Sequence, residues 1–124
     1  MATGHGTHVV LVVDDEPAIR LLCRVNLELA GYEVREAATI DQARAELDEG
    51  IDLVLLDMHV GVERGETLLE ELVQRRIPVA VVTGSVDIEA AVAKGATAVL
   101  AKPFTIEDLE ATVERLAALS PSRL

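Results

Sequence analysis

Short apolar runs alternate five times with stretches of helical periodicity along this chain of 124 residues. Each run has the length of one strand and is too short for a helix, and several are rich in the β-branched residues that suit buried strands. The stretches between them repeat apolar residues at spacings of three and four, which is typical of a helix with one buried face. Because parallel strands need crossover connections, this alternation predicts a parallel sheet covered by helices.

The expected fold is of class α/β: a flavodoxin-like, doubly wound (βα)5 domain with helices on both faces of a five-stranded parallel sheet in the order 2-1-3-4-5. A closed eight-fold barrel would need about twice this length. The expected strands cover residues 8–13, 32–37, 51–56, 78–82 and 97–101. The expected helix starts include Pro17, Thr39 paired with Gln42, and Thr105 paired with Asp108, and a short helix is expected over 88–94.

Helical periodicity also predicts which residues face the core. In the first helix the spacings of four, three and four select Ala18, Leu22, Val25 and Leu29. In the third helix, which follows a loop around Gly61 and Gly65, the expected inward residues are Leu68, Leu69, Leu72 and Val73.

The composition narrows the class of function. The formal net charge is −11, and only Tyr32 and Phe104 are aromatic. Nucleic-acid binding needs a basic surface, and single-strand binding adds aromatic stacking platforms, so direct binding of nucleic acid is not expected. The acidity instead suits a cation site or a partner protein with a basic face.

We expect a single domain over residues 8–119, with a flexible lead-in over 1–7 and a C-terminal tail over 120–124. The apolar runs fall far short of the roughly 20 residues that cross a membrane, and no secretion signal opens the chain. The single cysteine, Cys23, suits a reducing compartment and is expected to be a packing residue. These features predict a cytoplasmic protein without a membrane segment.

Polar side chains stand at the ends of four of the expected strands. Asp14 and Asp15 follow the first strand, Asp57 the third, Thr83 the fourth and Lys102 the fifth. These four strands are neighbours in the predicted order, and open α/β sheets bind ligands outside the carboxyl ends of their strands. We therefore expect the five side chains to meet at one edge of the sheet.

The chemistry of this set points to phosphoryl transfer. Three neighbouring carboxylates repel one another, and a hard divalent cation relieves that repulsion. Oxygen donors suit Mg²⁺, which also accepts phosphate oxygens. Asp57 would act as a nucleophile toward phosphorus, because carboxylates form aspartyl phosphates. Lys102 and Thr83 would then contact the other phosphoryl oxygens.

With these residues the chain resembles the receiver domains of two-component response regulators over nearly its full length. The matching stretches are Val12-Val13-Asp14-Asp15-Glu16-Pro17, Leu55-Leu56-Asp57-Met58, Val82-Thr83-Gly84 and Lys102-Pro103-Phe104. The resemblance implies a phosphorylation-dependent switch that is not an enzyme, although it assists its own phosphorylation and dephosphorylation. A sensor histidine kinase or a phosphotransfer protein would donate the phosphoryl group to Asp57, and an unknown downstream protein would receive the signal.

The resemblance also implies individual roles. Asp15 and Asp57 would bind Mg²⁺ directly, Asp14 would bind it through water, and His59 would contribute its backbone carbonyl. Thr83 and Lys102 would sense the new phosphoryl oxygens, and the Lys102–Pro103 peptide bond would be cis. The change would spread to the face formed by the fourth helix, the fifth strand and the fifth helix, and dimerisation through that face is one hypothesis.

One departure from the family pattern keeps alternatives open. Receivers typically carry Tyr or Phe three residues before the lysine, where this chain has Val99, so the usual coupling of threonine to an aromatic ring cannot operate in its common form. One alternative is a receiver that binds partners without phosphorylation. Another is a Mg²⁺-dependent aspartyl-phosphate phosphatase, but such an enzyme needs an aspartate where this chain has His59.

Overall fold

The computed structural model describes residues 8–60, 63–84 and 88–120. The lead-in predicted over 1–7 and most of the predicted tail lie outside the described residues. The main sheet has five parallel strands in the order β2-β1-β3-β6-β7, which confirms the predicted topology. The strands are β1 (Val9–Val13), β2 (Glu33–Ala37), β3 (Leu53–Asp57), β6 (Val79–Thr83) and β7 (Ala98–Ala101).

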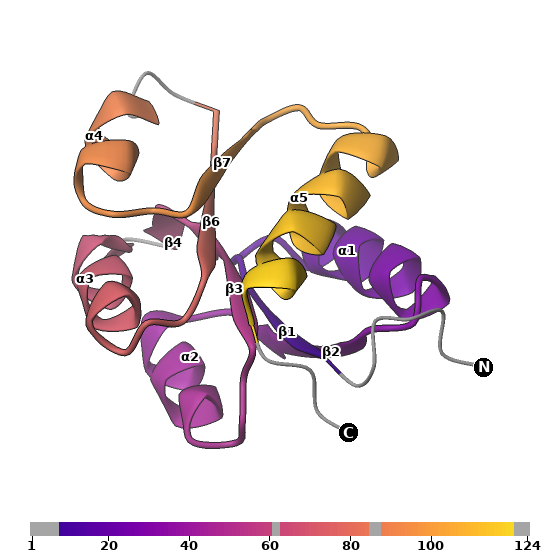
Figure 1. The fold of residues 1–124 in the computed structure, drawn as a ribbon, viewed down its shortest axis with the longest axis horizontal. Helices are drawn as coiled ribbons and strands as arrows, with labels where there is room; N and C mark the ends of the chain where they lie inside the picture. Colours follow the sequence, from indigo (N-terminus) through magenta and orange to yellow (C-terminus); the bar gives the residue numbers. More distant parts are fainter. Residues whose placement is uncertain (1–7, 61–62, 85–87, 121–124) are drawn as a thin grey trace.

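Helices cover both faces of this sheet (Figure 1). One face carries α1 (Pro17–Leu29) and α5 (Ile106–Leu119), and the other carries α2 (Ile40–Leu47), α3 (Glu66–Gln74) and α4 (Ile88–Ala93). Among the described residues, none of these helices is both long and apolar enough to cross a bilayer.

Successive residues of each strand enter opposite cores. On β3, Val54 and Leu56 pack beneath α2, α3 and α4, whereas Leu53 and Leu55 pack beneath α1 and α5. This is the two-residue period of a strand. Because both faces are covered, all five residues of β1, β3 and β6 are buried, which explains their continuous apolar runs.

Side-chain caps begin two of the helices as predicted. Thr105 and Asp108 form a complete capping box at α5, in which each side chain accepts a hydrogen bond from the other residue's backbone N–H. At α2 the Thr39 hydroxyl accepts from the backbone N–H of Gln42, but the Gln42 side chain accepts from Ala38, the residue before the cap. The α2 cap is therefore a variant of the predicted box.

The buried face predicted for α1 is wrong. Leu22, Val25 and Leu29 are 38%, 47% and 82% exposed, and the core is formed instead by Cys23 and Leu27, which are at most 2% exposed. Both sets of residues satisfy helical spacing, because α1 carries apolar side chains around most of its circumference. Spacing alone could not choose between them.

Two smaller differences concern the segment from β3 to α3. The region predicted as a loop contains a short antiparallel pair, β4 (His59–Val60) with β5 (Glu63–Arg64). Strands of two residues are too short to show an alternating pattern. In α3, Leu68, Leu69 and Leu72 are fully buried as predicted, but Val73 is half-exposed at the helix edge, where it packs against Gly95.

Candidate functional site

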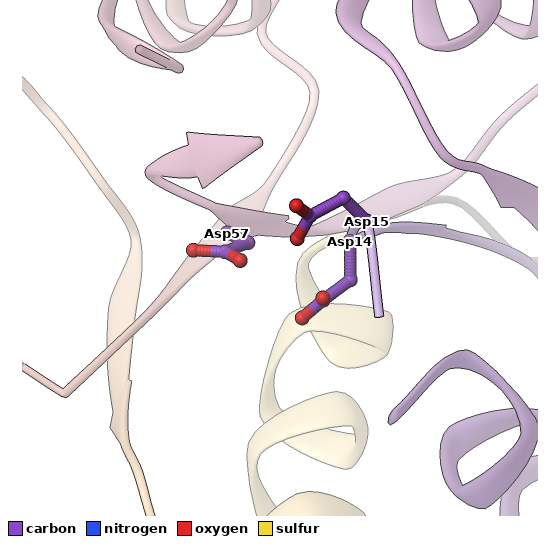
Figure 2. A group of neighbouring side chains, drawn as sticks. All are labelled: Asp14, Asp15 and Asp57. Atoms are coloured by element: carbon purple, nitrogen blue, oxygen red, sulfur yellow. The ribbon is translucent and has the colours of Figure 1, made fainter. Parts of the chain in front are cut away.

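Three carboxylates meet at the carboxyl edge of the sheet. Asp14 and Asp15 follow the last residue of β1, and Asp57 is the last residue of β3, the neighbouring strand. One oxygen from each of the three lies within 4.8 Å of the others, and Figure 2 shows the side chains extending into one shared space. Asp14 and Asp57 are buried, whereas Asp15 is exposed. The predicted convergence of these three residues is confirmed.

Lys102, the residue that follows β7, joins this cluster. Its Nζ lies 3.3 Å from Oδ2 of Asp14 and 3.5 Å from Oδ2 of Asp57, and the Glu16 carboxylate lies 3.9 Å away. One cation therefore faces several carboxylates. The Lys102–Pro103 peptide bond that follows is cis, as the family resemblance implies.

Backbone N–H groups fix the two buried carboxylates. The N–H of His59 donates to Oδ1 of Asp57 at 3.0 Å, and the N–H of Glu16 donates to Oδ1 of Asp14 at 2.9 Å. In each pair the donor stands two residues after the aspartate, so the turn that leaves the strand also orients the side chain. The His59 side chain is exposed, and the role predicted for its carbonyl stays a prediction.

Burial and charge shift the pKa values of the two facing groups. Burial, together with repulsion from Asp14, raises the pKa of Asp57 and outweighs the hydrogen bond from His59 and the attraction of Lys102, which both act to lower it. Burial acts to lower the pKa of Lys102, but Asp14 and Asp57 together outweigh it and leave that pKa raised. Lys102 therefore stays charged, while Asp57 is easier to protonate than an ordinary aspartate.

Thr83 is the last residue of β6 and is buried beside this edge. Asp57 pairs in register with Val82, so Thr83 stands one residue beyond Asp57 on the adjacent strand. The backbone N–H of Lys102 donates to the Thr83 carbonyl at 2.9 Å, which ties the end of β6 to the chain after β7. All five predicted side chains therefore belong to neighbouring strand ends.

Gly65 lies close to the backbone of Asp57 and Met58. A Cβ added at this glycine would lie 3.1 Å from the Asp57 carbonyl oxygen and 3.3 Å from the Cα of Met58. The N–H of Gly65 donates to the Met58 carbonyl at 2.8 Å. The absence of a side chain therefore lets the start of α3 close over the chain that leaves β3.

Sequence reasoning missed two residues at this edge, Glu16 and Arg20. Glu16 supplies a backbone donor to Asp14 and a carboxylate near Lys102. The Nη1 atom of Arg20 donates to the Asp14 carbonyl at 2.7 Å. The sequence does contain a signal for Arg20: it lies in the first turn of the helix that begins at Pro17, and that turn lies beside the strand end that carries Asp14.

The donor set suits a magnesium ion. Mg²⁺ binds oxygen at about 2.1 Å in octahedral geometry, so its ligands lie about 2.9 Å apart when adjacent and about 4.2 Å apart when opposite. One oxygen from each carboxylate lies within 4.8 Å of the others, so the three side chains can face a single ion of this size. The residues present therefore fit the ion by both chemistry and separation.

A doubly wound sheet whose carboxyl edge holds an acidic cluster beside a lysine is the architecture of a receiver domain. Comparison of the sequence with known families agrees: the response regulator receiver domain family matches residues 10–114. The chain belongs to this family. Receiver domains are the signalling switches of two-component systems and are generally not classed as enzymes.

Similar curated proteins are transcriptional regulators. The chain is 33% identical over 115 residues to the DNA-binding dual master transcriptional regulator RpaA of Synechocystis, covering 86% of this chain and 48% of that protein. It is 34% identical over 113 residues to the phosphate regulon transcriptional regulatory protein PhoB of Pseudomonas aeruginosa, covering 85% and 49%. The chain thus spans about half the length of these relatives.

Solved structures show the same fold. The receiver domain of NtrX from Brucella abortus superposes with a TM-score of 0.82 at 34% identity, covering 90% of this chain and 99% of that one. The chemotaxis response regulator CheY4 of Vibrio cholerae superposes with a TM-score of 0.80 at 30% identity, covering 89% and 98%.

Proposed function

We propose that this chain is a phosphorylation-dependent switch that accepts a phosphoryl group on Asp57 in the presence of Mg²⁺. The proposed donor is a sensor histidine kinase or a phosphotransfer protein. The observation that carries the proposal is the cluster itself: carboxylate oxygens of Asp14, Asp15 and Asp57 lie within 4.8 Å of one another, with the Lys102 ammonium 3.5 Å from Asp57.

The proposed step is a transfer between a histidine and an aspartate. An oxygen of ionised Asp57 forms a bond to phosphorus while the bond from phosphorus to the donor's histidine nitrogen breaks, and that electron pair returns to the imidazole. Lys102 is close enough to pair with one oxygen of the transferred group. The Thr83 hydroxyl is the proposed donor to another.

Mg²⁺ would be held by Asp15 and Asp57 directly, by Asp14 through water, and by the carbonyl of His59. When bound, it neutralises negative charge on the carboxylates and on the phosphoryl group. The support for this assignment is the all-oxygen donor set and its separation.

The exposed side of α1, the helix that begins next to the acidic strand end, supports a protein as the donor. Among the described residues, seven large apolar side chains are exposed, and four of these lie on α1: Leu21, Leu22, Val25 and Leu29. An exposed apolar patch of this kind is typical of a protein interface. Leu29→Ser is expected to slow transfer from a protein donor and to leave labelling by acetyl phosphate, which needs no docking surface, unchanged.

The proposed output surface is the face formed by α4, β7 and α5. On this face Val99 is partly buried against the core beneath α2, α3 and α4. A cavity of about 380 Å³ beside it is lined in part by Val99, Pro103 and Arg115. Dimerisation through this face is one form that the output would take, and light scattering with and without beryllofluoride tests it.

The decisive experiment is labelling with acetyl phosphate and Mg²⁺, followed by intact-mass spectrometry. The parent chain is expected to gain one phosphoryl group, and to gain none when EDTA is present. Asp57→Asn is expected to gain none, whereas Asp41→Asn, at an exposed aspartate on α2, is expected to behave like the parent. Equal labelling of Asp57→Asn and the parent would show that the assignment is wrong.

The same reactions separate the two alternatives. A parent chain that takes up no phosphoryl group from acetyl phosphate or from any kinase tested would favour a receiver that acts without phosphorylation. Repeated turnover of p-nitrophenyl phosphate would favour a phosphatase. We expect single labelling and no turnover.

A further inference from the structure

Arg20 links α1 to the backbone of the acidic strand end. Its Nη1 donates to the carbonyl oxygen of Asp14 at 2.7 Å, and its Nε donates to Oε1 of Glu36 on β2 at 3.1 Å. The second oxygen of Glu36 accepts from Nη1 of Arg24 at 2.6 Å. Only 17% of the Arg20 side chain is exposed, so its bonds are partly shielded from water and salt.

The carbonyl that Arg20 holds belongs to the peptide group between Asp14 and Asp15. A peptide group is planar, so fixing its oxygen fixes the direction in which the chain enters Asp15. The other side of Asp14 is held as well, because its N–H donates to the Ala37 carbonyl at 3.1 Å. Asp15 is the exposed carboxylate of the three, so core packing constrains it less than it constrains Asp14 or Asp57.

We propose that Arg20 is a positioning residue for the acidic cluster: it holds the Asp14–Asp15 peptide group in the orientation that brings the Asp15 carboxylate to Asp57. The inference rests on the proposed function, because Asp15 and Asp57 are the metal ligands of that function. Arg20 acts through the peptide group, because its hydrogen bonds go to the Asp14 carbonyl and to the Glu36 carboxylate. Glu36 holds the guanidinium in place from β2.

Removal of Arg20 changes the Mg²⁺ affinity in opposite directions depending on whether its charge or its hold on the peptide group matters more. A cation beside the cluster opposes the binding of a second cation, so loss of the charge alone would strengthen Mg²⁺ binding. Loss of the hold on the peptide group would weaken it, by roughly tenfold, the lower end of the effect of outer-shell partners on metal affinity. The sign of the change therefore decides between the two roles.

The test compares Arg20→Met with Arg24→Met in the full chain, with Mg²⁺ affinity measured by isothermal titration calorimetry. Arg24 is a matched control, because it lies on the same helix, pairs with the same Glu36 and carries the same charge, but is 45% exposed and pairs with Glu28. We expect Arg20→Met to bind Mg²⁺ roughly tenfold more weakly, and Arg24→Met to bind like the parent. Arg20→Lys should also bind weakly, because one ammonium group cannot reproduce the two-pronged guanidinium contact.

A second measurement needs no metal. The amide nitrogen of Asp15 shares its peptide group with the Asp14 carbonyl, so its ¹⁵N chemical shift reports the hydrogen bond from Arg20. In metal-free protein we expect this resonance to move in Arg20→Met and to stay in place in Arg24→Met. Urea unfolding of each variant verifies that it is folded.

Each outcome bears on the proposal. Unchanged or tighter Mg²⁺ binding in Arg20→Met overturns it, and so does equal weakening in the two methionine variants. If the parent chain itself binds no Mg²⁺, the proposed function fails. The Asp15 resonance then still decides whether Arg20 holds the peptide group.

Discussion

Asp57→Asn is expected to stabilise the metal-free fold at neutral pH. The Asp57 carboxylate lies within 4.8 Å of two other carboxylates, and burial raises its pKa, so the folded state disfavours its charged form. Asparagine has nearly the same shape. Its amide oxygen can still accept the hydrogen bond that His59 now donates to Oδ1 at 3.0 Å.

The size of the effect follows from the distances. With an effective dielectric constant of about 20, two charges at 4.8 Å, the upper limit of these separations, repel by about 3.5 kcal/mol, so Asp14 and Asp15 together oppose the Asp57 charge by about 7 kcal/mol. Lys102, whose Nζ lies 3.5 Å from Asp57, stabilises the Asp57 charge by about 5 kcal/mol. Solvent screening at exposed Asp15 reduces the difference, and burial of Asp57 adds to it. We expect a gain of about 1–2 kcal/mol in the free energy of unfolding.

Urea unfolding followed by circular dichroism measures this gain, first in EDTA and then with Mg²⁺. In Mg²⁺ the higher free energy of unfolding of Asp57→Asn should shrink or reverse. Mg²⁺ stabilises the folded parent by binding to it, whereas the variant has lost one metal-binding carboxylate. Asp41→Asn is the control. Its side chain is 91% exposed in the first turn of α2, so its loss should change little or slightly destabilise the helix.

The pH dependence gives a second check. Because the folded pKa of Asp57 is raised, stability from its protonated form is present below the unfolded pKa and is lost as pH rises through the folded pKa. The advantage of Asp57→Asn should therefore appear over that interval and disappear in acid. A variant less stable than the parent in EDTA at neutral pH would refute the electrostatic reasoning, as would an advantage that persists in acid.

Three further predictions concern the packing around the site and the helices. Gly65→Ala should lower the free energy of unfolding, measured in urea, by about 1–3 kcal/mol, because its Cβ would press on the Asp57 carbonyl. Gly84→Ala should cost less, because its Cβ would meet Lys102 at 3.6 Å, and equal losses in the two variants would contradict this reasoning. Thr105→Ala should cost about 1 kcal/mol through loss of the capping box, and Thr105→Ser should recover most of it in the same assay. Burial raises the pKa of Cys23 to about 11, so a thiol reagent such as dithionitrobenzoate should react slowly until urea unfolds the chain; rapid reaction of the folded protein would argue against the buried position.

The sheet and the candidate site could be predicted because both depend on strong, redundant signals. The five apolar runs mark the strands of a sheet buried on both faces, and only a crossover connection fits the spacing between them. Once the strand order is given, the residues that follow each strand must lie at one edge. Asp57 and Lys102 are 45 positions apart in the sequence, yet this rule alone brings them together.

The rotation of α1 could not be predicted, because its sequence offers two apolar faces. Periodicity selected the face with Leu22, Val25 and Leu29. The structure buries the other face and turns Arg20 and Arg24 toward Glu36 on β2. Ion pairs between α1 and β2 accompany that choice, and a hydrophobic pattern does not contain them. The exposed apolar face then becomes evidence for a partner instead of evidence for the core.

The same limit explains why the sequence indicated the carboxylates but not the groups that orient them. Asp14 and Asp57 are buried, and each accepts a hydrogen bond from a backbone N–H two residues further on. Their strand ends and the turns that follow are sufficient to aim them. Asp15 stands on the surface beyond the strand, where sheet register no longer determines its direction. An exposed ligand in an otherwise buried site needs support from outside the sheet, and the contact of Arg20 with the Asp14 carbonyl is in the position to provide it.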